Sequence, residues 1–326
     1  MFYNKSGHKL NESSSNTMAT QTETITTPVS KLELRTAYGP VYRDVLDTPP
    51  RDCTSDEIPV IDLSGIFSPN LDDRKAVAAQ VNSAGVNTGF FYIKNHGISS
   101  DIVNKARRQV DAFFKQPEEA KLALAKGQSK YFNGYSPPRT TLINRGDKID
   151  TRESLSWRYS PENDPEHPQP LESLPEEVKP WIRGEDFVWE RTAHLPGFKD
   201  DVLGYWQACL LLARKLARTF ALALDLPEDY FDSRTTYPGA DGVFNYYPVP
   251  SPEELQDDAV GLGSHTDLQL FTLLWQDQNG GLQVLNKDGQ WIKAKPIPDT
   301  FVVNIGVSSL EDPVWADSDR FFLRTS

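Results

Sequence analysis

The sequence predicts an α+β protein in which a helical N-terminal portion precedes a β-rich second half. Up to Leu226, apolar residues recur at intervals of three and four, which is the period of an amphipathic helix. After Pro238, short β-prone runs alternate with turn residues such as Asn279-Gly280-Gly281. A dense series of short strands is typical of a double-sheet jelly roll, or double-stranded β-helix. We therefore expect a jelly-roll core in the second half.

Three helical patterns occupy the first part of the chain. The first covers Asp72–Asn82 and ends where Gly85–Gly89 interrupt the period. The second can be capped by Ser100 or Asp101. The longest extends from Asp200 to Leu226, and its continuous apolar stripe is typical of a helix that packs on a core.

The predicted strands are short and are separated by turns. Phe90–Ile93 is the clearest β-prone run of the first half. The strands expected in the second half are Phe244–Tyr247, Leu268–Gln276, Leu282–Leu285, Trp291–Lys295 and Thr300–Ile305. Between the helices, the stretch Tyr131–Pro196 is rich in Pro, Arg, Glu and Asp, and we predict long loops with short helices there.

Composition and charge narrow the class of protein. The chain has 326 residues, of which 38% are apolar, so it can bury a large core. Its formal net charge of −12 argues against nucleic acid or an anionic membrane surface as a partner, because both attract clustered Lys and Arg. Cys53 and Cys209 are too few for a disulfide framework, which favours a reducing, cytoplasmic location. Residues 1–30 lack the apolar core of a signal peptide and are predicted to form a disordered tail.

His265 and Asp267 are the strongest candidates for metal ligands. On an extended strand, residues i and i+2 point to the same face, so the imidazole and the carboxylate can reach one metal ion while Thr266 points away. One imidazole and one carboxylate are two of the three protein ligands in the facial triad that holds non-haem iron(II). The spacing alone is weak evidence, because a polar strand end with a solvated Asp has the same pattern.

The sequence around this pair resembles the iron(II)/2-oxoglutarate-dependent dioxygenases of the isopenicillin N synthase-like group, which includes plant gibberellin and flavonoid oxygenases. The similarity extends from about residue 30 to residue 306 and rests on several blocks in the order typical of that family. The blocks are Ile58-Pro-Val-Ile-Asp62-Leu, Thr88-Gly-Phe-Phe-Tyr-Ile-Lys-Asn-His96-Gly-Ile, Asn245-Tyr-Tyr-Pro248, Gly261 to Gln269, Gly280-Gly-Leu-Gln-Val, Trp291 and Phe301-Val-Val-Asn-Ile-Gly306.

The resemblance implies a fold, cofactors and further site residues. The jelly roll would hold iron between its sheets with the helices outside, so the chain would be one catalytic unit. Fe(II), 2-oxoglutarate as co-substrate and dioxygen are implied, with ascorbate as a candidate accessory cofactor. Asn245 and Tyr247 would form hydrogen bonds near bound 2-oxoglutarate, although a strand of this composition also packs well in a core. His96 is expected to be structural, and His167 and His194 are expected to be solvated.

The chain departs from this family after Gly306. The resembled enzymes continue with a distal histidine, the third iron ligand, and an Arg-x-Ser that binds the far carboxylate of 2-oxoglutarate. No histidine follows His265, and Arg324-Thr-Ser326 lies where the distal histidine would be expected. We therefore interpret that Arg-x-Ser match as accidental and expect the C-terminal strands of the roll to be missing. The regions are then a tail (1–30), a helical N-terminal dioxygenase region (31–236) and a partial jelly-roll domain that binds iron and 2-oxoglutarate (237–326).

The favoured function is a non-haem iron(II)- and 2-oxoglutarate-dependent oxygenase that hydroxylates, desaturates or cyclises a small organic metabolite in specialised metabolism. The absent distal histidine and Arg-x-Ser leave two alternatives open: a non-catalytic binding protein, and an iron oxidase that does not use 2-oxoglutarate. We favour a retained intron, a frameshift or a misplaced stop, rather than a natural chain end, as the reason why the distal histidine and the Arg-x-Ser are absent. Arg139, Arg145 and Arg152 are candidates to meet an anionic substrate, yet charged loop residues are usually solvated. Neither the substrate nor the oligomeric state is predicted.

Overall fold

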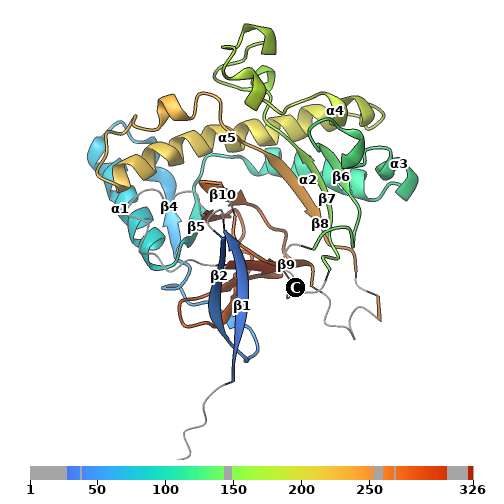
Figure 1. Cartoon of the computed structure of the whole chain (residues 1–326). Helices are drawn as coiled ribbons and strands as arrows, with labels where there is room; N and C mark the ends of the chain where they lie inside the picture. The colour runs from blue at the N-terminus through green and yellow to red at the C-terminus, as the bar shows by residue number, and fades with distance from the viewer. Residues whose placement is uncertain are drawn as a thin grey trace, which may run out of the picture.

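A long helix lies across the strands of this fold. The computed structural model describes residues 28–36, 39–142, 149–249, 251–252, 260–267, 269–306 and 322–325. Figure 1 shows helix α5 (Phe198–Ala223) extending over the strands from one side of the molecule to the other. The other helices are α1 (Leu71–Asn87), α2 (Ser100–Phe114), α3 (Glu118–Leu122) and α4 (Phe187–Arg191). Among the described residues, no helix combines the length and the apolar character needed to cross a membrane.

Two sheets form the centre of the fold. A four-stranded sheet has the order β10 (Phe271–Leu274), β13 (Phe301–Ile305), β5 (Phe90–Lys94) and β4 (Val60–Asp62). A five-stranded sheet has the order β3 (Arg51–Asp52), β12 (Trp291–Lys293), β11 (Leu282–Leu285), β14 (Phe322–Thr325) and β9 (Leu262–His265). Neighbouring strands are antiparallel except for β4 with β5 and β3 with β12.

The alternation of side chains along β5 explains how these sheets pack. Phe90 and Tyr92 lie on one face and contact Leu282, Val284 and Ile292 of the five-stranded sheet. Phe91 and Ile93 lie on the other face, in a buried cluster with apolar residues of α1 and α5. The four-stranded sheet is therefore covered by helices on one side and by the second sheet on the other. This double-sheet arrangement confirms the predicted jelly-roll core.

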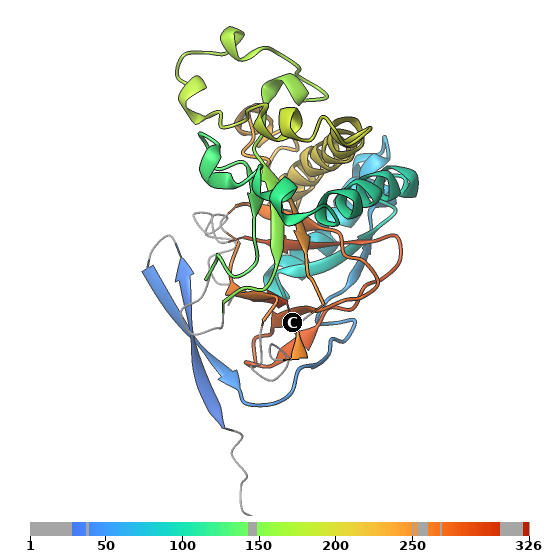
Figure 2. The same ribbon diagram turned by 90° about the vertical axis from the view of Figure 1, so that its right-hand side faces the viewer.

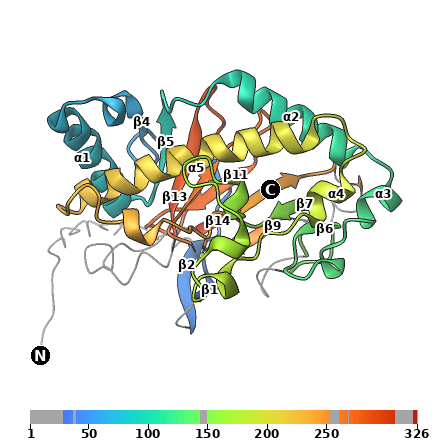
Figure 3. The same ribbon diagram turned by 90° about the horizontal axis from the view of Figure 1, so that it is seen from above.

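A separate three-stranded sheet lies towards one end of α5, opposite the end near β4 and β5 (Figures 1 and 3). Its order is β6 (Gly134–Ser136), β7 (Glu153–Trp157) and β8 (Gly242–Tyr246), and both pairs are antiparallel. Leu155 and Trp157 of β7 pack in a buried cluster with aromatic residues of α2 and α5. The stretch Tyr131–Pro196, predicted as loops with short helices, therefore also contains two strands of a sheet.

The first elements that the structure describes form a β-hairpin. Strands β1 (Val29–Thr36) and β2 (Gly39–Leu46) pair along their whole length, so the hairpin begins at the last two residues of the predicted tail, 1–30. Figure 2 shows this hairpin extending along one side of the molecule. Val45 packs against Leu285 and Trp291, which gives the hairpin an apolar contact with the second sheet. Residues 1–27 of the predicted tail lie outside the described part.

The C-terminal part of the roll also differs from its prediction. We expected the C-terminal strands to be missing, but Phe322–Thr325 form β14, which pairs antiparallel with β11 on one side and with β9 on the other. The backbone hydrogen bonds that β9 and β11 offer to a strand between them explain this placement. Residues 307–321, and the side chain of Arg324, lie outside the description. The predicted boundary between residues 236 and 237 does not separate the sheets. Strands from before and after it pair with each other, β5 with β13 and β7 with β8.

Helix α1 is longer than the sequence pattern indicated. It continues through Gly85 to Asn87, and Thr88 and Gly89 both donate backbone hydrogen bonds to the Ala84 carbonyl. Gly89 has a φ of 68°, the left-handed conformation in which glycine commonly ends helices. The helix therefore continues past Gly85 and ends at Asn87, shortly before Gly89, because only Gly89 adopts the terminating conformation.

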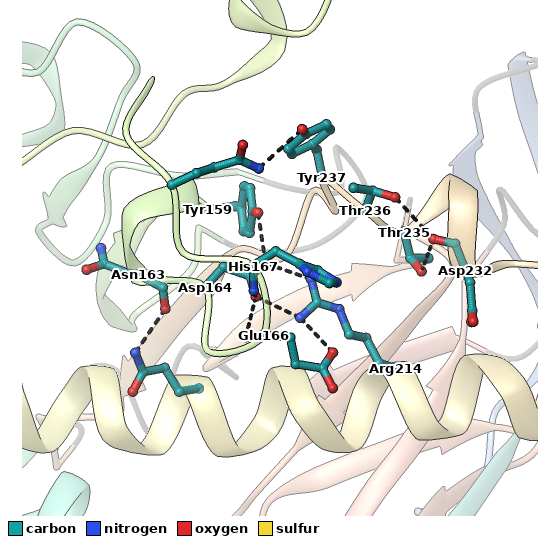
Figure 4. Close-up of polar contacts among 12 residues, drawn as sticks. Tyr159, Asn163, Asp164, Glu166, His167, Arg214, Asp232, Thr235, Thr236 and Tyr237 are labelled. Carbon is teal, nitrogen blue, oxygen red and sulfur yellow. Dashed lines mark hydrogen bonds and ion pairs between the residues drawn. The ribbon is translucent and has the colours of Figure 1, made fainter. Parts of the chain in front are cut away.

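A buried ion pair fastens the segment after β7 to α5. Figure 4 shows the Arg214 guanidinium on α5 reaching the Asp164 carboxylate, with bonds of 2.8 and 2.6 Å, while Tyr159 Oη donates to the same carboxylate at 2.9 Å. The Asp164 side chain is 0% exposed. Burial raises the pKa of Asp164, but the hydrogen bonds from Arg214 and other donors outweigh it and lower the pKa to about 2. A carboxylate that stays charged therefore holds this segment on α5.

Candidate metal centre

His265 and Asp267 lie together at the end of strand β9. His265 is the last residue of the strand, and its Nε2 is 3.4 Å from Oδ1 of Asp267. About a fifth of each side chain is exposed, 19% for His265 and 21% for Asp267. The structure therefore brings together the two residues that the sequence predicted as iron ligands. Their role as ligands stays a prediction at this point.

The imidazole of His265 is oriented by its own strand. Its Nδ1 lies 2.9 Å from the Gly263 carbonyl oxygen, so the tautomer that satisfies this contact carries the proton on Nδ1. Nε2 then keeps its lone pair and faces Asp267. Histidines that bind metals commonly donate their other ring N–H to a carbonyl or carboxylate in this way. The peptide of Gly263 is itself held, because its N–H donates to the Asp150 carboxylate at 3.0 Å.

The carboxylate of Asp267 is held by two donors on its other oxygen. Thr272 Oγ1 and Asn304 Nδ2 donate to Oδ2 at 2.5 and 2.8 Å. Burial raises the pKa of Asp267, but the contact with the His265 ring and the hydrogen bonds from Thr272 and Asn304 lower it to about 2. Asp267 is therefore ionised at neutral pH, as a hard cation requires.

Gly306 explains why the chain can bring Asn304 so close to Asp267. A Cβ at Gly306 would lie 1.8 Å from the carbonyl oxygen of Gln269 and 2.9 Å from that of Asp267. The end of β13 can approach the loop that carries Asp267 only because this position has no side chain. The glycine of the Phe301-Val-Val-Asn-Ile-Gly306 block therefore has a role in building the site.

These donors fit iron(II) as two parts of a protein site. One imidazole nitrogen and one ionised carboxylate oxygen face the same point, and both are oriented by further hydrogen bonds. In the described residues, however, no group of three or more His, Cys, Asp or Glu could hold a metal ion. His96 is elsewhere, with its ring 4.8 Å from Phe301 and its Nδ1 accepting from the Ile98 N–H, as expected for a structural histidine. His167 and His194 are exposed.

Asn245 and Tyr247, the predicted contacts for 2-oxoglutarate, lie on one side of β8 and its continuation. Both are exposed, and Tyr247 is 41% exposed. They do not pack in the core, which was the alternative role considered for this strand from its sequence. The amide oxygen of Asn245 accepts a hydrogen bond from Arg152 at 2.6 Å. Asn245 and Tyr247 therefore lie on the exposed side of the strand, opposite the aromatic cluster that Phe244 and Tyr246 join.

The residues before β7 connect this face to the metal pair. The N–H groups of Thr151 and Arg152 donate to the carbonyl oxygens of Val260 and Gly261, at 3.1 and 3.2 Å. Together with the Asp150 bond to Gly263, these contacts tie the start of β7 to the segment that leads into His265. Arg152 and Asn245 therefore lie on a strand pair that is joined to the metal strand.

Several residues that build this site were not found from the sequence. Asp150, Thr272 and Asn304 each bond to the pair or to its strand, but they lie in different parts of the chain. The alternation of polar and apolar residues in Glu153-Ser-Leu-Ser-Trp157 is the signal that could have revealed strand β7. Arg152 was a candidate to meet an anionic substrate, with a solvated loop position as the alternative, and its bond to Asn245 was not foreseen; Arg145 lies outside the described part.

A double-sheet fold with a His/carboxylate pair at a strand end defines the class of non-haem iron oxygenases. Comparison with known families agrees. A family model described as "non-haem dioxygenase in morphine synthesis N-terminal" matches residues 58–177, and the model of the 2OG-Fe(II) oxygenase superfamily matches residues 240–311. The chain therefore belongs to the 2OG-Fe(II) oxygenase superfamily, an enzyme family that uses Fe(II) and 2-oxoglutarate.

Relatives of known name support the same family. A 2-oxoglutarate-Fe(II) type oxidoreductase, ppzC, from Metarhizium majus is 46% identical over 297 residues, covering 89% of this chain and 79% of that protein. A 1-aminocyclopropane-1-carboxylate oxidase from Dictyostelium mucoroides is 30% identical over 287 residues, covering 77% of this chain and 72% of that protein. These names favour an enzyme over a non-catalytic binding protein.

Solved structures show the same fold. A full-length protein from Neurospora crassa, crystallised in complex with alpha-KG, superposes with a TM-score of 0.66 at 27% identity. The superposition covers 85% of this chain and 82% of the Neurospora crassa protein. The fold and the family predicted from the sequence are therefore both confirmed.

Proposed function

We propose that this chain is an iron(II)- and 2-oxoglutarate-dependent oxygenase in which His265 and Asp267 hold the iron. The observation that carries this proposal is the geometry of the pair. The imidazole Nε2 and the carboxylate Oδ1 are 3.4 Å apart, and each group is oriented from behind by a hydrogen bond. A partly exposed His/Asp pair without a metal role would not need both groups to be fixed in this way.

When bound, iron(II) would activate dioxygen with electrons that 2-oxoglutarate supplies on its decarboxylation to succinate. The protein residues have separate tasks. His265 and Asp267 would hold the metal, which would supply further positions for 2-oxoglutarate and dioxygen. Asn245 and Tyr247 flank the co-substrate from the exposed side of β8, with Asn245 held in place by Arg152.

The substrate that we propose is a small organic metabolite, and the reaction is hydroxylation, desaturation or ring formation. The names of related proteins support this class. Gibberellin 20 oxidase 3 of Arabidopsis thaliana is 31% identical, and the Neurospora crassa protein has also been crystallised with alpha-KG and thymine. We place the enzyme in the cytoplasm, since both cysteines are free thiols. Ascorbate remains a candidate accessory cofactor.

Anaerobic titration of the 326-residue chain with Fe(II) and 2-oxoglutarate tests the proposal without a substrate. A chelated complex gives a visible charge-transfer band, and we expect this band in the wild type. His265→Ala and Asp267→Ala should abolish it. His194→Ala is the matched control, because His194 is exposed and its Nε2 contacts Gln116 at 2.6 Å, away from the pair. An absent band in folded wild-type protein, or an unchanged band in His265→Ala, would refute the assignment.

A further inference from the structure

A cavity of about 300 Å³ opens where α1 packs against the C-terminal half of α5. Its wall combines residues of these two helices with the end of the 3-10 turn η1 (Leu63–Phe67) and two loop residues. Figures 1 and 3 show this end of α5 beside α1, whereas β9, which carries His265, lies towards the other side. In the described part of the chain, no residue that lines the cavity contacts His265 or Asp267. The cavity is therefore separate from the metal pair.

Positive charge exceeds negative charge in the wall of this cavity. The lining residues include Arg74, Lys215 and Arg218, while Glu228 is the one carboxylate among them. The chain as a whole has a formal net charge of −12, so the charge of the cavity is opposite to that of the protein. Clustered positive charge in a concave site attracts anions. The charge of the wall therefore favours an anionic ligand.

Both arginines are neutralised and held in place by carboxylates. Arg74 donates to the two carboxylate oxygens of Glu228, each at 2.9 Å. Arg218 donates in the same way to Asp232, at 3.1 and 2.7 Å. Bidentate pairs of this kind fix the orientation of the guanidinium group. Two cations of the cavity are therefore positioned in advance, and the positive charge in excess belongs to Lys215.

Lys215 is the cation of this cavity without a carboxylate partner. Its ammonium group forms no ion pair or hydrogen bond with the residues that the structure describes. Instead, Nζ lies over the ring of Phe67, 5.6 Å from the ring centroid. The ring itself packs closely on Gly97, where an added Cβ would lie 3.2 Å from Cζ of Phe67. The cavity therefore contains an ammonium group that is oriented by an aromatic ring but not neutralised.

The remaining lining residues are apolar or already have hydrogen-bond partners. Ile66 is buried, Leu222 is half-buried and Phe67 is exposed. The hydroxyls of Ser68 and Thr219 donate within the protein, at 2.6 and 2.9 Å. The polar hydrogens left for a ligand therefore belong to cations, which can only donate. A ligand that fits this wall has an anionic acceptor group and an apolar body.

We propose that this cavity binds a small organic carboxylate with a compact apolar body, at a site distinct from the metal centre. Lys215 and Arg218 are three residues apart on α5 and project from the same side, so both can meet one carboxylate. The apolar body would cover Phe67 and Leu222. A single negative charge matches the one excess positive charge, and Glu228 would repel a second. The inference goes beyond the proposed oxygenase function and does not depend on it.

Ligand-observed NMR titration of the 326-residue chain tests this site with benzoate, benzamide and acetate. We expect benzoate to bind about tenfold more tightly than benzamide, which lacks the charge, and than acetate, which lacks the apolar body. Lys215→Met should lower the affinity for benzoate to that for benzamide. The variant should keep the fold, because Lys215 is exposed. Lys199→Met is the matched control, since Lys199 is an exposed lysine of the same helix, 3.7 Å from Asp186.

The outcomes distinguish this site from the metal pair and from a phosphate site. Equal affinities for benzoate and benzamide, or a preference for benzoate that persists in Lys215→Met, would overturn the proposal. Loss of benzoate binding in His265→Ala would place benzoate at the metal pair instead. If inorganic phosphate displaces benzoate at a lower concentration than acetate does, the site takes a phosphate group and the carboxylate assignment is wrong. An absent charge-transfer band would refute the proposed function and leave these affinities unchanged.

Discussion

The carboxylate of Asp150 accepts a hydrogen bond from the backbone N–H of Gly263 at 3.0 Å, across 113 positions of the sequence. The carbonyl of the same Gly263 lies 2.9 Å from Nδ1 of His265. The peptide groups of Gly263 thus link Asp150, at the start of β7, to the imidazole of His265, which faces Asp267. The Asp150 side chain is 1% exposed, so this bond is shielded from water.

Asp150→Asn is expected to weaken iron(II) binding while the fold is kept. Loss of the carboxylate removes the charge-assisted bond to Gly263 and loosens the peptide that orients His265. Residues that orient metal ligands typically contribute about 10- to 100-fold to affinity, and we expect a loss of about tenfold. Anaerobic competition with a chromophoric iron chelator measures it. Asp101→Asn is the control, since Asp101 is exposed and pairs with Lys105 at 3.2 Å. Equal affinities in both variants would contradict this role.

The bound iron is expected to have one imidazole ligand from this chain. No histidine follows His265 in the sequence, and within the residues that the structure describes His96, His167 and His194 lie away from the pair. Pulsed EPR of the nitric oxide adduct counts coupled imidazole nitrogens directly. Added imidazole should then occupy the open ligand position and tighten iron binding by about tenfold, because an imidazole nitrogen is a good ligand for iron(II). Two protein imidazoles in the spectrum, or no effect of added imidazole, would show that another histidine binds.

Strands bounded by turn glycines were predictable, and strands that depend on distant partners were not. Leu282–Leu285 was predicted with its observed bounds, because Gly281 and Gly289 end the adjoining turns with φ of 111° and 78°. β7 was missed, since its pairing with β8 joins residues far apart in sequence and its neighbourhood is rich in Pro and charge. Local composition cannot show such long-range pairing.

The same distinction applies to the site. His265 and Asp267 were found because their spacing has a local geometric reason. Asp150 and Asn304 act through contacts with residues far away in the sequence, and nothing in their own sequence neighbourhood marks them. The sequence therefore predicts the pair itself, while the groups that orient it become visible only when the chain is folded.

Lys126→Met is expected to stabilise the protein at neutral pH, because Lys126 is partly buried and burial does not favour its charge. The pKa of Lys126 falls from 10.5 to about 8 on folding, so between these values the unfolded chain binds more protons. The charged lysine therefore costs stability below pH 8, and this cost disappears as the pH rises towards 10.5. Differential scanning fluorimetry should show a rise in Tm of about 2–4 °C at pH 7. The rise in Tm should be smaller at about pH 10. A variant with a lower Tm than the wild type at pH 7 would contradict the prediction and would show that Lys126 stabilises the fold.

Asp164→Asn is expected to destabilise the protein by about 3 kcal/mol at pH 7, since it leaves the partly buried Arg214 without its main partner. The folded pKa of Asp164 is about 2 and its ordinary value is 3.8. The carboxylate therefore stabilises the fold above pH 3.8, and this contribution is lost as the pH falls towards 2. Urea unfolding at pH 7 and pH 3 should show that the difference between wild type and variant shrinks in acid. Asp111→Asn, which changes an exposed carboxylate 3.5 Å from Lys115, should change stability at neither pH. A difference that stays constant from pH 7 to pH 3 would mean that the charge of Asp164 is not what holds the segment on α5.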